Sequence, residues 1–140
     1  MLPDVNVLLN SIQTASPFHA SAKHWLEAAF NSEAGVCLAW VALLGFLRIS
    51  TRVGVLHQPL PVSDALALID NWITHPNARI VHPGDRHAGI LGRLLLTCGS
   101  AGNLTTDAHL AALAIEHNVE IGTFDRDFKR FSGLRFQLLS

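Results

Sequence analysis

The sequence has few charged residues and no excess of either sign, which limits how it can bind a partner. Charged side chains make up 15% of the 140 residues, with 10 Lys and Arg against 11 Asp and Glu. A protein that binds nucleic acid through charge alone is usually strongly basic. Any contact with nucleic acid must therefore be local, through a basic patch or a bound cation.

Cysteines and long apolar runs are also scarce. The two cysteines, Cys37 and Cys98, lie far apart without metal-ligand spacing, which favours two reduced, buried thiols. No run reaches the roughly 18 apolar residues of a membrane span. The N-terminus lacks a basic segment and is interrupted by Asp4, so it does not resemble a signal peptide. We expect a cytoplasmic protein that does not enter the membrane.

Apolar residues are plentiful, at 49% of the chain, so the sequence predicts a packed core rather than disorder. The length fits one domain over residues 1–140, and the sequence shows no repeat and no linker. We therefore expect a single folded unit.

Short apolar or β-branched runs alternate with stretches of helical periodicity. The first strand must be very short because it contains Pro3, and the other predicted strands are 35–39, 79–81, 119–124 and 134–138. Three predicted helices span residues 5–12, 40–49 and 85–98, and helix 40–49 is expected to be covered on both sides. Three more are predicted from their starts, at Ser16-Pro17, at a Ser63 cap and at a cap of Thr105 or Thr106. The helix after Ser63 is expected to carry Leu66 in its buried stripe. Strands separated by helices call for right-handed crossovers, so we predict a three-layer α/β/α sandwich with a central, mainly parallel sheet.

Four aspartates fall near the expected carboxyl ends of strands, where open parallel sheets bind ligands. Asp4 follows the first strand, Asp125 and Asp127 follow strand 119–124, and Asp107 lies in the first turn of its helix. Converging carboxylates repel one another unless a cation is present, and oxygen ligands are what Mg²⁺ and Mn²⁺ take. The helix dipole alone would also explain Asp107, and turn chemistry would explain Asp127, so spacing leaves a metal site undecided.

Five segments resemble, in order, the PIN-domain ribonucleases, in particular the VapC toxins of VapBC toxin–antitoxin pairs. They are residues 2–8 (LPDVNVL), 45–51 (GFLRIST), 85–87 (DRH), 103–114 with NL and DAHLAALA, and 123–128 (TFDRDF). No single motif is highly specific, but the ordered set is, and it covers nearly the whole chain. This resemblance supports the α/β/α fold.

The resemblance implies an endoribonuclease that hydrolyses RNA phosphodiesters with Mg²⁺ or Mn²⁺, is inhibited by a small antitoxin protein and forms a homodimer. Asp4, Asp107 and Asp125 match the catalytic, metal-binding acids, and Asp127 matches a less constant metal ligand beside them. The cation would bind a phosphate oxygen and activate a water for in-line attack. Two further residues would help to hold the cofactor by orienting its ligands, although plain surface polarity explains them equally well: Asn6 and Thr123.

One position departs from the family pattern. Many members carry a glutamate where this chain has Gly45, and no acid lies between Glu33 and Asp64. Glu116 lies nine residues after Asp107, about half a turn away on the helix surface, and cannot substitute. The departure suggests one metal ion rather than two, or more coordination by water.

Basic residues near Gly45 and two apolar helices offer candidate contact surfaces. Arg48 and Arg52 would form a ridge on one helix face, either as a solvated edge or as a phosphate contact. Helices 5–12 and 40–49 would supply surface for the antitoxin or a second subunit, although core packing explains them as well.

The sequence leaves two rival functions open. Gly45 favours a catalytically weak PIN-like module that binds RNA or a partner. A phosphate-handling α/β enzyme or receiver-like domain with Asp4 as nucleophile would need a nearby lysine, for which only Lys129 is placed. Histidine metal chemistry is not favoured, and His109, which points about 200° around the helix from Asp107, is not expected to be a co-ligand of it. Six further histidines lack paired spacing, so we expect them to be solvated or capping: His19, His24, His57, His75, His82 and His87.

Overall fold

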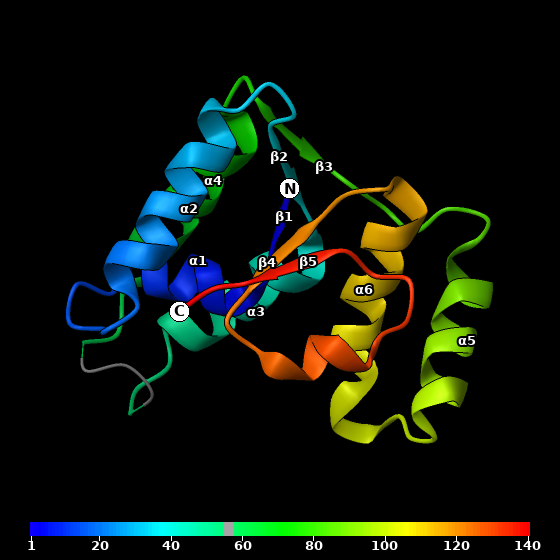
Figure 1. Ribbon diagram of the computed structural model, residues 1–140. Coiled ribbons are helices and arrows are strands. Elements are labelled where there is room, and N and C mark those ends of the chain that lie inside the picture. The colour runs from blue at the N-terminus through cyan, green and yellow to red at the C-terminus, as the bar shows by residue number, and fades with distance from the viewer. Residues whose placement is uncertain (55–57) are drawn as a thin grey trace.

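Five short parallel strands form the centre of the computed structural model, which describes residues 1–54 and 58–140 (Figure 1). They are β1 (Leu2–Pro3), β2 (Val36–Leu38), β3 (Ala78–Ile80), β4 (Ile121–Thr123) and β5 (Phe136–Leu138). β4 pairs with both β1 and β5, and β2 pairs with β3. The Cys37 N–H donates to the Met1 carbonyl at 2.8 Å and joins the two sets in the order β3-β2-β1-β4-β5.

Pro3 explains why β1 is short and why its link to β2 is sparse. The N–H groups of Leu2 and Asp4 donate to Glu120 and Gly122 at 2.7 and 2.9 Å, so both face β4. Successive residues of a strand alternate sides, and Pro3 would have pointed its N–H toward β2 but has none to donate. The predicted very short first strand is confirmed.

Helices lie on both faces of this sheet (Figure 1). They are α1 (Val5–Ile12), α2 (His19–Asn31), α3 (Trp40–Ser50), α4 (Val62–Thr74), α5 (His87–Cys98) and α6 (Thr105–His117), with 3₁₀ turns η1 (Gly102–Leu104) and η2 (Arg126–Arg130). α1 to α4 share one apolar cluster, which Leu38 joins, while α5 and α6 share the other, which Cys37 joins. Alternate residues of β2 thus serve opposite layers, and the three-layer α/β/α prediction is confirmed.

Helix starts differ from several predictions because backbone turns replace side-chain caps. α2 begins at His19, and the Ser16 hydroxyl accepts the N–H of Phe18 at 3.1 Å in a turn that precedes the helix. α6 continues directly from η1, so Thr105 lies inside the helix and neither of the two threonines caps it. α4 begins at Val62, which places Ser63 within the first turn rather than at the cap.

Two burial predictions are wrong. The third helix, α3, is not covered on both sides, since Trp40 is 43% and Leu44 57% exposed. On α4 the buried stripe runs through Ala65, Ile69 and Trp72, which leaves Leu66 49% exposed. Apolar character alone did not reveal which side of each helix meets a neighbour.

None of the helices within residues 1–54 and 58–140 is long and apolar enough to cross a membrane. Cys37 is buried and Cys98 partly buried, and both are free thiols. His57 lies outside the described residues, so the expectation for that side chain has no structural counterpart.

Candidate active site

Asp4 is fixed at the junction of β1 and α1 by three hydrogen bonds. One carboxylate oxygen, Oδ1, accepts the N–H of Val5 at 2.7 Å and caps α1. The other, Oδ2, accepts the Thr123 hydroxyl at 2.7 Å and the Asn6 amide at 3.0 Å. The side chain is only 5% exposed, and this burial raises the pKa of Asp4 while the Thr123 hydrogen bond opposes the rise.

Asn6 and Thr123 connect Asp4 to the end of β4. Thr123 is fully buried, and its oxygen also accepts the N–H of Asp125 at 3.0 Å. The Asn6 amide oxygen accepts the N–H of Phe124 at 3.2 Å. The structure therefore brings both residues to Asp4, which plain surface polarity would not require.

Asp107 faces the same region from the first turn of α6. Burial, followed by the charges of Asp4, Asp125 and Asp127, raises the pKa of Asp107 to about 7. These three acids come from the end of β1 and the end of β4, so all four carboxylates lie close enough to interact electrostatically. Near neutral pH, Asp107 is thus divided between its charged and protonated forms.

Asp125 and Asp127 differ in how firmly they are held. The Asp125 carboxylate accepts the N–H of Asp127 at 2.8 Å and caps η2. Asp127 itself is exposed. The side chain that stabilises this turn by accepting a backbone N–H is therefore Asp125, and not Asp127 as the sequence had suggested. Asp127 lies at the rim of the cluster.

A divalent cation fits the chemistry of these donors, although they do not form a closed ligand shell. Within residues 1–54 and 58–140, no three Asp, Glu, His or Cys side chains are gathered closely enough to hold a metal ion. After burial, the charges of Asp4, Asp125 and Asp127 add to the raised pKa of Asp107, as expected for carboxylates that repel one another at longer range. A hard cation would relieve this repulsion, and an all-oxygen donor set suits Mg²⁺ or Mn²⁺.

A cleft of about 510 Å³ opens beside Asp4 and Asp107 and has α3 as its wall. Gly45 and Arg48 both line it, so the position that lacks the family glutamate does face the acids. A Cβ atom added at Gly45 would lie 3.1 Å from Cγ2 of Val5, a tight contact with α1. α3 ends at Ser50, so Arg52 lies beyond the helix and the predicted two-arginine ridge is wrong.

The cleft also contains two threonines that sequence reasoning missed, Thr51 and Thr106. Thr106 immediately precedes Asp107, and Thr51 lies three residues after Arg48. Such spacing is a weak signal, because hydroxyl residues are common near helix ends.

Glu116 and the histidines lie outside this cleft. The Glu116 carboxylate accepts the N–H groups of Gly84 and Arg86 at 2.7 and 2.9 Å, which confirms that it cannot join the acids. His109 also points elsewhere, with its Nδ1 2.9 Å from Nε2 of His87. His87 is only 8% exposed, so the expectation of a solvated or capping role is wrong for this residue. The pairing joins α5 to α6 across 22 residues, a separation that no local pattern reveals.

The fold and the site together define a class of protein: a parallel α/β/α domain with carboxylates gathered at the ends of its strands. The sequence model of the PIN domain matches residues 1–134, and the chain belongs to the PIN-domain family. It is 44% identical over 133 residues to Ribonuclease VapC37 of Mycobacterium tuberculosis, covering 95% of this chain and 92% of that protein. It is also 41% identical over 136 residues to Ribonuclease VapC33 of the same species, covering 97% and 95%.

Solved structures share the fold at lower identity. VapBC2 from Rickettsia felis, bound to a DNA fragment from its promoter, superposes with a TM-score of 0.70 at 19% identity, covering 99% of this chain and 98% of that one. M. tuberculosis VapC20, described as a sarcin-ricin loop cleaving toxin, gives 0.69 at 17% identity, with 96% and 98% covered. At these identities the likeness supports the fold, while the curated relatives support the family.

Proposed function

We propose that residues 1–140 form a single ribonuclease domain, the toxin of a VapBC toxin–antitoxin pair, which hydrolyses RNA phosphodiesters at the acidic cleft. The observation that carries this proposal is that Asp4 and Asp107 line one cleft, while Asp125, just after β4, lies close enough to raise the pKa of Asp107. The two relatives compared above are both named VapC ribonucleases and are matched over at least 92% of their length. Dependence on a divalent metal is general in this family, and we propose Mg²⁺ or Mn²⁺ as the ion.

The metal would be held by Asp4, Asp107 and Asp125, with Asp127 at the rim. When bound, such an ion supplies charge stabilisation at a phosphate oxygen and lowers the pKa of a water. The protein contributes the orientation of its own carboxylates. Thr123 and Asn6 donate to Oδ2 of Asp4 and limit its rotation, which fixes the orientation of this carboxylate at the cleft.

Arg48 is placed to contact the RNA backbone. Its side chain is exposed and lines the cleft that also contains Asp4 and Asp107. Guanidinium groups bind phosphate oxygens through paired N–H donors, which positions a nucleic acid without reading its sequence. One such local cation is consistent with a chain whose net charge is only −1.

α3 provides the surface that we assign to protein partners. Trp40 and Leu44 lie one turn apart and are exposed, whereas α1 has no large apolar side chain among those that are exposed in the described residues. Aromatic and large apolar side chains are enriched at protein interfaces. We propose that this row contributes to the homodimer or to the contact with the antitoxin, in the cytoplasm where both would meet RNA.

The receiver-like alternative is not favoured, since it needs a lysine beside Asp4 and Lys129 does not line the cleft that contains Asp4. Lys129, the one lysine considered for that role, lies exposed on η2.

Cleavage of end-labelled RNA tests the proposal. We expect cutting with Mg²⁺ or Mn²⁺, loss of cutting with chelator, and at least a 100-fold loss in Asp107→Asn. Leu66→Ala, an exposed residue of α4, serves as the control and should cut like wild type. RNA binding without any cutting under all metal conditions would instead support the non-catalytic module that Gly45 suggested.

A further inference from the structure

A second hollow, of about 300 Å³, adjoins the acidic cluster on the side of η2. Its lining consists of Phe18, Phe124, Arg126, Leu138, Leu139 and Ser140. The rings of Phe18 and Phe124 lie with their centroids 4.9 Å apart at 41°, and Phe18 is 43% exposed. A flat ligand that covered the exposed part of this ring would bury further apolar surface, which favours binding.

We propose that Phe18 and Phe124 form a nucleobase site, in which an unpaired base of the RNA substrate stacks on the open face of Phe18. Single-stranded RNA is commonly recognised by stacking of splayed bases on aromatic rings, with basic side chains beside them. Arg126 supplies the cation at this hollow and would contact either the base or an adjoining phosphate. The inference rests on the proposed ribonuclease function, because it names where that substrate binds.

The hollow and the acids are linked through the chain that follows β4. Phe124 lies between Thr123 and Asp125 in the chain, and its N–H donates to the same Asn6 side chain that donates to Asp4. A base on this ring pair would therefore belong to a nucleotide close to the phosphate at the acids. No comparable aromatic pair lines the 510 Å³ cleft beside Asp4 and Asp107.

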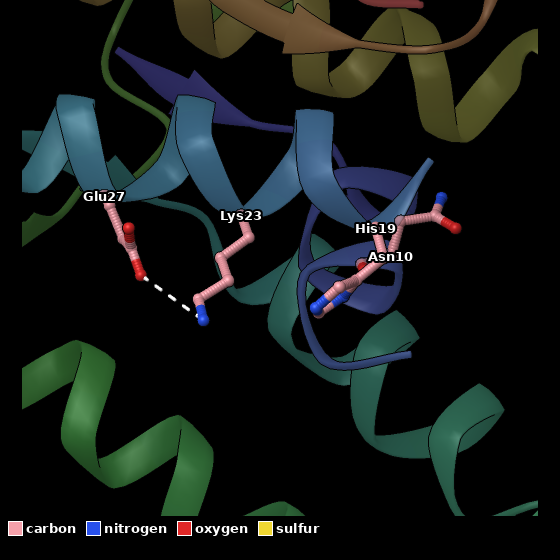
Figure 2. Close-up of polar contacts among 4 residues, drawn as sticks. All are labelled: Asn10, His19, Lys23 and Glu27. Carbon is pink, nitrogen blue, oxygen red and sulfur yellow. Dashed lines mark hydrogen bonds and ion pairs between the residues drawn. The ribbon is translucent and has the colours of Figure 1, made fainter. Parts of the chain in front are cut away.

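The backbone turn that carries Phe18 is held in place before any RNA arrives. Its N–H donates to the Ser16 hydroxyl at 3.1 Å, and that hydroxyl donates to the Asn10 amide oxygen at 2.6 Å. The next residue, His19, places its Nδ1 2.9 Å from the Asn10 carbonyl oxygen, and Figure 2 shows the two side by side. Asn10 belongs to α1, the helix that Asp4 caps, so these two contacts tie the turn carrying Phe18 to that helix.

Figure 2 also shows a contact of a different kind further along α2. Lys23 and Glu27 form an exposed ion pair at 4.0 Å further along the helix (Figure 2). Exposed pairs of this kind contribute little to stability and order nothing beyond themselves. A ring on an anchored turn, packed against Phe124, loses less entropy when it binds a ligand than a ring on a mobile loop, which favours Phe18 as a stacking platform.

Binding is tested with short single-stranded oligoribonucleotides that carry 2-aminopurine, a base whose fluorescence is quenched by stacking. The full-length protein carries Asp107→Asn in Mg²⁺ buffer, so that bound RNA is not cut. We expect quenching on binding, and we expect Phe18→Ala to abolish the quenching and weaken binding roughly 5- to 100-fold. Phe18→Trp should retain both. Phe18→Leu, which keeps an apolar side chain but no ring face, should behave like Phe18→Ala.

Steady-state cleavage in the otherwise wild-type chain gives the second measurement. Phe18→Ala should raise KM with little change in kcat, because the ring touches the base and not the reacting phosphate. If Phe18→Ala melts early, Phe18→Leu carries the comparison. Leu66→Ala is again the matched surface control.

Outcomes separate this inference from the proposed function. Wild-type cleavage together with unchanged binding, quenching and KM in Phe18→Ala and Phe18→Leu would overturn the nucleobase site and leave the ribonuclease standing. Quenching that depends on Phe18 in a chain that never cuts RNA would retain the site and overturn the enzyme. Loss of binding to a co-expressed antitoxin, with RNA binding intact, would reassign the hollow to a protein partner and overturn the proposal.

Discussion

Asp4 is both a helix cap and a buried acid, and these two roles make different demands on a substitution. Asparagine is as good a cap as aspartate, whereas alanine leaves the first turn of α1 without an acceptor. Alanine would also leave the buried Thr123 hydroxyl without the acceptor it uses now. The carboxylate charge matters for the proposed chemistry, while the oxygen atoms matter for the fold.

We therefore expect Asp4→Asn to abolish RNA cleavage while its unfolding free energy stays within about 1 kcal/mol of wild type. Asp4→Ala should also be inactive but lose roughly 2–4 kcal/mol, from one cap and one buried hydroxyl. Urea unfolding monitored by circular dichroism measures both. An Asp4→Ala protein as stable as Asp4→Asn would show that the hydrogen bonds of Asp4 contribute nothing to stability.

Asp107 gives the metal-free protein a distinctive dependence on pH. Its folded pKa of about 7 lies above the ordinary value of 3.8, chiefly through burial and then through the neighbouring acids. A carboxyl whose pKa is raised in the folded state binds its proton more tightly there than in the unfolded chain. Its ionisation thus opposes folding, and stability should fall as pH rises from about 4 through 7.

Melting temperatures measured in chelator between pH 5 and 8 test whether stability falls as the pH rises. Wild type should lose stability mainly between pH 5 and 7 and level off above that, and Asp107→Asn, which cannot ionise, should show a flatter profile. Glu116→Gln is the control, since Glu116 has a lowered pKa from its Gly84 hydrogen bond and lies outside the cleft. Parallel profiles for wild type and Asp107→Asn would mean that Asp107 does not titrate in this range.

Among whole helices and strands, the sequence predicted those features that depend on neighbouring residues in the chain. Pro3 required a very short first strand, and the alternation of strands and helices required the parallel sheet. The acids were found because each follows a strand or opens a helix, where parallel sheets gather their ligands. Helix starts were missed at α2 and α6 because the preceding turns are stabilised by the backbone and by Ser16, not by a side-chain cap.

The missed side chains depend on contacts between distant elements. Phe18 meets Phe124 from the other end of the chain, and His87 meets His109 across the α5–α6 contact. Neither pairing leaves a periodic signal, because each is fixed by how two helices or loops pack in three dimensions. The exposure of Trp40 and Leu44 was missed for the same reason.

Gly45, in the interior of α3, allows helix propensity to be compared with crowding against a neighbouring helix. Replacing glycine with alanine inside a helix gains about 1 kcal/mol, but a Cβ here would lie 3.1 Å from Val5. We expect Gly45→Ala to be within about 1 kcal/mol of wild type, as crowding offsets propensity. Gly92→Ala on α5, where nothing lies within 4 Å of the new Cβ, should show the gain without the crowding.

Gly45→Glu extends this comparison to the metal. Its carboxylate would enter the cleft that contains Asp4 and Asp107. Without metal it adds repulsion, so the protein should melt at a lower temperature, whereas Mn²⁺ affinity should rise several-fold. Calorimetric titration of Mn²⁺ into both proteins measures this. Weaker metal binding in a well-folded variant would show that position 45 does not replace the family glutamate.

For the whole molecule, the order of the sheet is what makes one site out of distant residues. β1 and β4 are neighbours although they come from opposite ends of the chain, and Asp4 and Asp125 follow them directly. α6 packs on the opposite layer from α1 and brings Asp107 to the same edge. The site therefore exists only when both layers are assembled on the sheet, so binding at the site should be coupled to folding.

Metal binding should consequently stabilise the entire fold. A ligand that binds only the folded state adds about 2.7 kcal/mol at 100 times its Kd, which for a chain of this size raises Tm by roughly 5–10 °C. The shift should be smaller at pH 6 than at pH 8, because the metal must displace a proton from Asp107, whose pKa is about 7. Thermal melts across a Mn²⁺ series at the two pH values measure the effect, with Asp107→Asn as the variant that should lose most of it. An equal shift in Asp107→Asn would place the stabilising cation elsewhere on the molecule, and the absence of any shift at millimolar Mn²⁺ would remove the acidic cleft as a metal site.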